Sequence, residues 1–122
     1  MAVSSISLAA ITSSKIWSDT AQSNAIVVVQ ASSTVVHSIE IDNTVNAAQA
    51  VYVKIFNSAG SPTLGTTAPD EIIYAPANVK FSHVIPGGKT FGTGLQVATV
   101  TAGGTAGTTA PGTAVPVKIV YV

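Results

Sequence analysis

The residues of this chain that could do chemistry are two histidines and a few carboxylates, and their spacing assembles no reactive centre. His37 and His83 each fall on an apolar face of a strand-like run. A bound metal ion needs three or four ligands with supporting hydrogen bonds, and the sequence offers no third ligand beside them. We therefore expect both histidines to be core or interface residues, and no metal or other cofactor to be bound.

The other catalytic patterns are incomplete. Asp70 and Glu71 are adjacent, and neighbours on a strand point to opposite faces, so they cannot act together as general acid and base. The serines lack the Gly-x-Ser-x-Gly nucleophile turn. The stretch Gly87–Thr90 is similar to the end of a phosphate-binding loop, but the rest of that motif and its helix are missing, which favours a turn. The sequence thus predicts that the protein is not an enzyme.

Aromatic side chains offer a binding chemistry instead. Trp17, Tyr52 and Tyr74 could form a platform on which a sugar stacks. Aromatic residues make up only 6% of the chain, so we expect most of them to be needed for packing and for interfaces. Sugar binding stays open as an alternative to protein binding.

Composition narrows the range of partners. Charged residues are 8% of the chain against a typical quarter, the net charge is +0, and the basic residues are all lysines. A nucleic-acid binder normally shows a basic stripe with arginines, and binding to an anionic membrane also requires positive charge, so neither partner is expected. The longest apolar run, Ala25–Val29, is far too short to span a bilayer. A surface so poor in charge is suited to being covered by neighbouring molecules.

Strand-like runs bounded by Gly, Pro, Ser and Thr clusters recur about every ten residues, and no convincing helix interrupts them. These runs are Ser5–Leu8, Ser23–Gln30, Val35–Asp42, Ala50–Asn57, Glu71–Tyr74, Val79–Ile85, Thr90–Thr101 and Val115–Val122. About eight short strands predict an all-β fold, an antiparallel β-sandwich of jelly-roll or Greek-key type. We assign residues 1–20 to an N-terminal arm and residues 21–122 to the sandwich domain.

Alternation within these runs predicts the core. In Ala50–Asn57 the β-branched residues alternate with Tyr52, Lys54 and Phe56, the period of two of a sheet strand. The residues expected to point inward are Ile39, Val53, Ile55, Phe81 and Ile119. A short repeat, Gly65–Pro69 and again Gly107–Pro111, precedes a strand each time, which indicates either two equivalent arches of a sandwich or a chance recurrence in simple loop sequence.

The segment Tyr52–Gly104, somewhat under half of the chain, resembles a recurring pattern in small structural proteins of tailed phages and prophages. That pattern has a Tyr-x-Lys-x-aromatic-Asn strand, a Pro-Thr-x-Gly-Thr-x-x-Pro-Asp arch, a Gly-Gly turn and a Phe-x-x-Gly-Leu strand. The matching residues here are Tyr52, Lys54, Phe56, Asn57, Pro62, Thr63, Gly65, Thr66, Pro69, Asp70, Gly87, Gly88, Phe91, Gly94 and Leu95. The resemblance implies a virion component made in the host cytoplasm, either a capsid decoration (cement) protein or a head–tail or tail accessory module, and it carries no catalytic residues.

From the resemblance and the low charge we expect a decoration protein on the phage capsid surface, bound to the major capsid protein and to copies of itself as a homotrimer. The segment Met1–Lys15 of this arm is the expected fastener, because an extended segment can add a strand to a neighbour's sheet edge; it could instead complete its own sheet. The candidate partner-binding residues are Ile6, Leu8, Ile11, Trp17, Tyr52 and Tyr74. The alternative is a tail, head–tail or fibre module that binds a receptor or a glycan.

Overall fold

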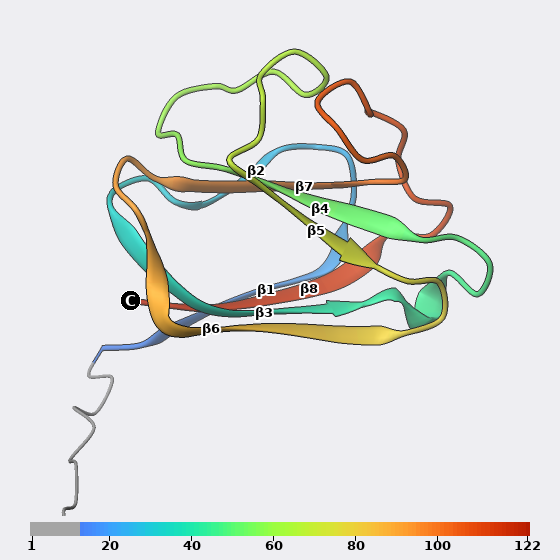
Figure 1. Cartoon of the computed structure of the whole chain (residues 1–122), viewed down its shortest axis with the longest axis horizontal. Helices are drawn as coiled ribbons and strands as arrows, with labels where there is room; N and C mark the ends of the chain where they lie inside the picture. The colour runs from blue at the N-terminus through green and yellow to red at the C-terminus, as the bar shows by residue number, and fades with distance from the viewer. Residues whose placement is uncertain (1–12) are drawn as a thin grey trace, which may run out of the picture.

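The computed structural model describes residues 13–122 and shows two antiparallel sheets of four strands each, packed face to face (Figure 1). This confirms the predicted all-β sandwich. The elements in chain order are β1 (Lys15–Gln22), β2 (Val27–Gln30), β3 (Thr34–Asp42), the 3-10 helix η1 (Asn43–Val45), β4 (Val51–Phe56), β5 (Glu71–Ala75), β6 (Lys80–Phe91), β7 (Leu95–Val100) and β8 (Val115–Tyr121). In the described part of the chain, no helix has the length and hydrophobicity needed to cross a membrane.

The order of the strands is that of a jelly roll. The lower sheet of Figure 1 has the order β1-β8-β3-β6, and the upper sheet has the order β2-β7-β4-β5. Each strand of the first half pairs with its counterpart from the end of the chain: β1 with β8, β2 with β7, β3 with β6 and β4 with β5. The chain is therefore one long antiparallel hairpin wound into two sheets, which is the jelly-roll arrangement.

The structure has a strand, β1, where the sequence analysis predicted none. β1 pairs with β8 from Lys15 to Gln22, so residues 15–20, which we had assigned to the arm, belong to the lower sheet. The predicted strand Ser5–Leu8 lies outside the described residues. Alternation in β1 is weak because this is an edge strand whose Ile16 points to solvent, and only Trp17 packs against the core.

A bulge explains two further differences. β6 continues through Pro86, Gly87 and Gly88, where the sequence predicted its end. Residues 85–88 lie opposite the single residue His37 of β3, and both glycines adopt positive φ, which other residues rarely do. His37 is thereby shifted off the inward face, and the buried hydrophobic residues of β3 are Val36, Ile39 and Ile41. Figure 1 shows β6 turning from the lower layer toward the upper one at this end of the sandwich.

The core lies between the two sheets, where the inward side chains of both are almost fully buried. Of the predicted core residues, Ile39, Val53, Ile55 and Ile119 are at most 1% exposed. Phe81 also packs against this cluster but is only half-buried, because β6 forms one edge of the lower sheet. The strand predicted within Ser23–Gln30 is β2, an edge strand of the upper sheet, and its Val28 is exposed.

The outer face of the upper sheet is covered by two loops, 57–70 and 101–114, which lie side by side above it in Figure 1. Beneath them, Lys54, Phe56 and Ala98 are buried although they point away from the core. The two loops contain the repeated Gly-Thr-Thr-Ala-Pro sequence, and the two copies touch: a Cβ placed on Gly65 would lie 2.6 Å from Thr108 Cγ2. The repeat thus supplies two arches that pack on one sheet and on each other.

Lys54 ties one of these loops to the sheet. Its side chain is fully buried, and its ammonium donates to the backbone oxygens of Thr105 at 3.2 Å and Gly107 at 2.6 Å. Among residues 13–122 no carboxylate forms an ion pair with it. Burial therefore lowers the pKa of the Lys54 ammonium below its ordinary value, because a charge removed from water is disfavoured.

The assignment of core residues predicts that two truncations lower the free energy of unfolding by unequal amounts. Ile39→Ala should lower the free energy of unfolding by about 2–5 kcal/mol, because it leaves a cavity between the sheets. Val84→Ala, on the solvent-facing side of β6, should change it by about 0.5 kcal/mol or less. Urea denaturation of the two variants measures both, and equal losses would show that the faces of the lower sheet are assigned incorrectly.

Lys54 predicts a stability that rises with pH. Since its pKa is lower in the folded state, the unfolded chain binds more protons in the window between that pKa and 10.5, and the free energy of unfolding increases through this window. Lys54→Met should lose this increase, whereas Lys118→Met, at an exposed position of β8, should keep it. Denaturation at a series of alkaline pH values makes the comparison, and parallel pH curves for the wild type and Lys54→Met would contradict the burial of the charge.

Candidate functional site

The structure brings two of the predicted binding residues together and separates the others. Tyr52 and Tyr74 are cross-strand neighbours on β4 and β5, with ring centroids 5.2 Å apart and planes tilted by 51°. Tyr74 is 49% exposed. Trp17 lies in β1 of the other sheet and packs against the core, so it is not part of an aromatic platform with them. The candidates Ile6, Leu8 and Ile11 lie outside the described residues.

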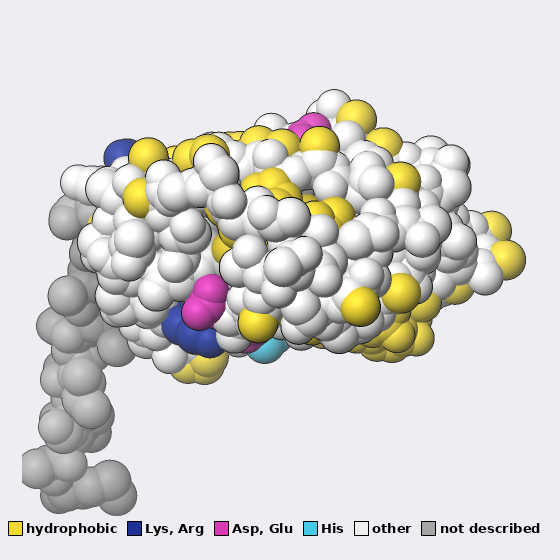
Figure 2. All heavy atoms as spheres, turned by 90° about the horizontal axis from the view of Figure 1, so that it is seen from above, with side chains coloured by type: hydrophobic (Ala, Val, Ile, Leu, Met, Phe, Trp, Pro, Cys, Tyr) yellow, Lys and Arg dark blue, Asp and Glu magenta, His cyan; other side chains and the backbone are white. Residues whose placement is uncertain are grey.

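Beside the tyrosine pair, a groove opens where the edges of the two sheets meet. β5 is the last strand of the upper sheet and β6 the last strand of the lower one, and both lie on the side nearest the viewer in Figure 1. The groove has a volume of about 360 Å³ and is lined by Glu71, Ile72, Ile73, Tyr74, Pro76, Phe81 and His83. Figure 2, seen from above, shows hydrophobic side chains gathered beside histidine, basic and acidic atoms along this side.

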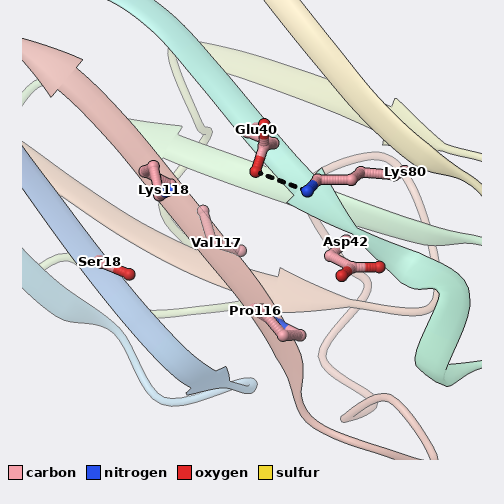
Figure 3. Close-up of a pocket in the computed structure, with 7 residues that line it drawn as sticks. All are labelled: Ser18, Glu40, Asp42, Lys80, Pro116, Val117 and Lys118. Carbon is pink, nitrogen blue, oxygen red and sulfur yellow. Dashed lines mark ion pairs between the residues drawn. The ribbon is translucent and has the colours of Figure 1, made fainter.

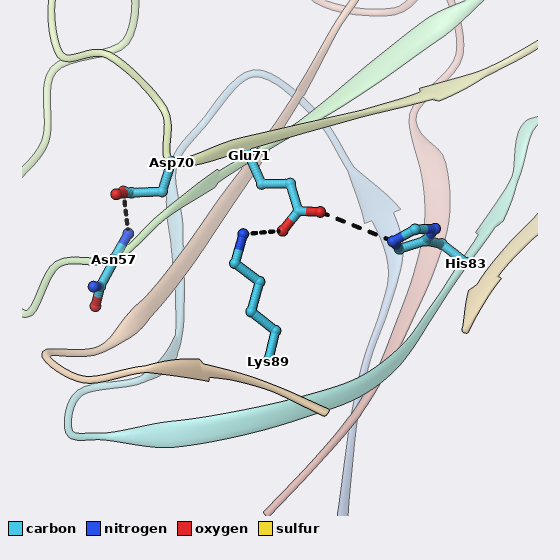
Figure 4. Close-up of polar contacts among 5 residues, drawn as sticks. All are labelled: Asn57, Asp70, Glu71, His83 and Lys89. Carbon is cyan, nitrogen blue, oxygen red and sulfur yellow. Dashed lines mark hydrogen bonds and ion pairs between the residues drawn. The ribbon is translucent and has the colours of Figure 1, made fainter. Parts of the chain in front are cut away.

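Three polar side chains span the mouth of the groove (Figure 4). Glu71 of β5 accepts a hydrogen bond from the Lys89 ammonium at 2.8 Å, and its other carboxylate oxygen lies 3.8 Å from His83 Nε2. Lys89 and His83 both belong to β6, so the contacts link the edges of the two sheets. All three side chains are partly exposed, and such pairs contribute little to stability.

The neighbouring carboxylate, that of Asp70, stabilises a loop and does not line the groove. Asp70 Oδ2 accepts from the backbone N–H of Asn57 at 2.7 Å, and the backbone N–H of Asp70 donates to the carbonyl of Ile55. These bonds close the base of the loop 57–70 where it leaves β4 and returns to β5. Asp70 and Glu71 therefore point to separate partners, and they do not form the pair that acid–base catalysis would need.

A second, smaller depression lies on the outer face of the lower sheet (Figure 3). It has a volume of about 220 Å³ and is lined by Ser18, Glu40, Asp42, Lys80, Pro116, Val117 and Lys118. Glu40 and Lys80 form an ion pair at 3.4 Å. Asp42 caps η1, and hydrogen bonds from the hydroxyl and then the backbone N–H of Thr44 hold the pKa of its carboxyl below its usual value. With these groups already paired, the depression has the character of a solvated polar surface.

The two histidines do not meet. His37 sits in the bulge against Gly88, where a Cβ would lie 2.9 Å from its Cε1, and His83 lies at the groove. Within residues 13–122, no three His, Cys, Asp or Glu side chains are grouped closely enough to hold a metal ion.

Comparisons of the chain with models of protein families, with curated proteins and with solved structures found no match. The function must therefore be inferred from the fold, the surface and the sequence pattern of Tyr52–Gly104.

Sequence reasoning missed most of the groove. It identified Tyr74, but it placed Phe81 in the closed core and gave no role to Ile72 or Pro76. One signal was available: Ile72 and Ile73 are adjacent in a very short strand that lies between Pro69 and Pro76, so one isoleucine had to point away from the core. Proline at both ends favours an edge strand, and an isoleucine on the outer side of an edge strand indicates a contact surface.

The ion pair across the groove mouth predicts a small coupling. Glu71→Gln and Lys89→Met, made singly and together, should give an interaction free energy of about 0.2–1 kcal/mol in a double-mutant cycle, because both side chains are partly exposed. Urea denaturation measures the four proteins. A coupling well above this range would mean that Glu71 and Lys89 fasten the two sheets together rather than border an open groove.

Proposed function

We propose that this protein is a structural component of a tailed-phage virion, most specifically a decoration (cement) protein. In this role it binds the major capsid protein on the outside of the shell, associates with copies of itself as a homotrimer, and stabilises the shell without catalysing a reaction. It is made in the host cytoplasm and assembles onto the capsid surface.

The observation that carries the proposal is a surface almost without charge that exposes large apolar side chains. Only 8% of the residues are charged. The exposed hydrophobic residues include Ile16 (67%), Val84 (66%) and Val28 (52%), each on an edge strand. A surface of this kind is suited to permanent contact with neighbouring subunits.

Two further features support the proposal. The segment Tyr52–Gly104, whose sequence resembles phage structural proteins, forms β5 to β7, nearly all of β4 and the first of the two covering loops. The jelly roll is an architecture that viral capsid domains use, together with lectins and cupins. Since one fold serves many functions, the fold alone would not choose among them, and the charge-poor surface favours the virion role.

Binding to a shell would depend on apolar and backbone contacts repeated over many copies. When several subunits of one oligomer engage the same particle, modest contacts multiply through avidity. Because few charges are available, electrostatic attraction contributes little, and binding should change little with ionic strength.

A second function is favoured by the aromatic pair. Tyr52 and Tyr74 present a partly exposed aromatic surface beside Glu71 and His83, and sugars are bound by such combinations of aromatic faces with polar groups. This arrangement suits a tail, head–tail or fibre module with a receptor- or glycan-binding role.

The test mixes the purified protein with phage shells that lack it and pellets the shells. We expect co-sedimentation that saturates at a fixed ratio of protein to shell and changes less than about tenfold in affinity between low and high salt. Failure to sediment with shells at any protein concentration would reject the decoration role. Binding of Tyr74→Ala to shells but not to glycans, with wild-type binding to both, would support the second function beside the first.

A further inference from the structure

The side of the molecule that carries the groove has two unpaired strand edges. β5 pairs only with β4, and β6 pairs only with β3, so in residues 13–122 each leaves one row of backbone N–H and C=O groups free. Proteins usually protect such edges with charge, proline or bulges. β6 has these devices near its ends, at Lys80 and at Pro86–Lys89, while the stretch Phe81–Ile85 between them contains none. This stretch is an available template for another strand.

A strand added beside Phe81–Ile85 would reach into the groove. The inward side of this stretch carries Phe81, His83 and Ile85, and the opposite wall carries the buried Ile73 of β5. Alternate side chains of an added strand would point the same way as these residues. The groove, at about 360 Å³, offers its apolar lining to those alternate side chains, while the others would face solvent.

The chain itself contains a segment of matching chemistry. Residues 1–14 contain no charged side chain, no glycine and no proline. Ser5, Ile6, Ser7 and Leu8 alternate polar and apolar residues, so one face of a strand made from them would be aliphatic and the other polar. The polar groups at the groove mouth, Lys89 and His83, already contact Glu71, so the occupant needs no charge of its own.

We propose that Ser5–Ala10 of one copy adds as a strand to the free edge of β6 in a second copy, with Ile6 and Leu8 in the groove between β5 and β6. The lower sheet of the second copy then gains a fifth strand beside β6. The contact joins unlike surfaces of two copies, an arm and a groove, so repeating it around a rotation axis closes a ring.

The position of β1 favours a second copy over the same one. β1 and β6 are opposite edges of the lower sheet, separated by β8 and β3, a distance of about 14 Å across the strands. An arm of twelve residues spans at most about 40 Å, so its length permits either route. The route to its own groove, however, requires the chain to pass β8 and β3 before it turns along β6, whereas a second copy can present its free β6 edge directly to the arm.

Disulfide trapping tests the proposal, because the natural chain contains no cysteine. Leu8→Cys is mixed with an isotopically labelled His83→Cys protein, and in parallel with a labelled Val84→Cys protein whose new thiol points to the solvent side of β6. We expect disulfides between labelled and unlabelled chains to form about tenfold faster with His83→Cys than with Val84→Cys. Equal rates for the two partners would overturn the proposal.

Sedimentation analysis supplies the second measurement. The full chain should form an oligomer, and deleting residues 1–12, which leaves β1 intact, should return it to a monomer. Ile6→Ser with Leu8→Ser should act like the deletion, while the matched pair Ser5→Ala with Ser7→Ala, on the other strand face, should leave association unchanged. A deletion variant that associates as well as the full chain would overturn the proposal. So would a double variant, Leu8→Cys with His83→Cys, that closes its disulfide within one chain at high dilution.

The proposal does not rest on the virion role. A full-length protein that binds shells as a monomer would overturn the arm exchange and leave the decoration role standing. An oligomer that depends on the arm but does not bind shells would support the arm exchange and reject the decoration role.

Discussion

The buried ammonium of Lys54 is the interaction on which the upper half of the molecule depends. A charge without a carboxylate partner is costly to bury, so it must be satisfied by the backbone oxygens of Thr105 and Gly107. These two bonds hold the loop 101–114 against the sheet. The same loop then fixes its neighbours: Gly103 lies against the ring of Tyr52, where a Cβ would be 3.1 Å from Cε1, and Thr108 packs on Gly65 of the other loop. Through Tyr52, the position of Tyr74 at the groove depends on a contact made at the centre of the sheet.

The jelly-roll winding divides the surface into protected and open parts. Loops cover the centre of the upper sheet, so all six residues of β7 are buried, although this strand has no second sheet above it. Polar side chains hold these loops down: Gln96 donates to the carbonyls of Ser58 and Gly60, and Asn46 exchanges two hydrogen bonds with Thr113. No comparable cover lies, in residues 13–122, over the free edges of β5 and β6. The groove is thus a consequence of where the chain places its long loops.

Sequence reasoning predicted the parts of the fold in which one strand face alternates cleanly with the other. It placed Ile39, Val53, Ile55 and Ile119 correctly in the core, because β-branched residues at every second position all lie on one face of a strand, and that face must be the buried one. β1 was missed since its exposed Ile16 and its polar neighbours blur that alternation. The predicted β6 ended too early because Pro86, Gly87 and Gly88 normally end a strand. They are tolerated here because β6 lies at the edge of the lower sheet and bulges opposite His37 of β3. The burial of Lys54 was not predicted, because nothing local in the sequence shows which carbonyls a distant loop will bring to it. The groove was missed for a related reason: it is formed by the edges of two sheets, and edges follow from strand order rather than from periodicity.

The scarcity of charge determines which contacts can hold this protein to another molecule. The ion pairs among residues 13–122 involve partly exposed side chains, and each such pair contributes about 0–1 kcal/mol. Apolar area removed from water contributes about 25 cal/mol per Å², so the exposed aliphatic side chains and the groove have the larger capacity for association. Apolar contacts are not directional, and a nearly uncharged surface cannot use repulsion to reject a wrong orientation. A strand edge provides the missing direction: its hydrogen bonds fix the axis of a partner strand, and a slip of one residue would turn every aliphatic side chain out of the groove. In the proposed arm exchange, pairing at the strand edge would therefore set the orientation, and burial in the groove would supply most of the free energy.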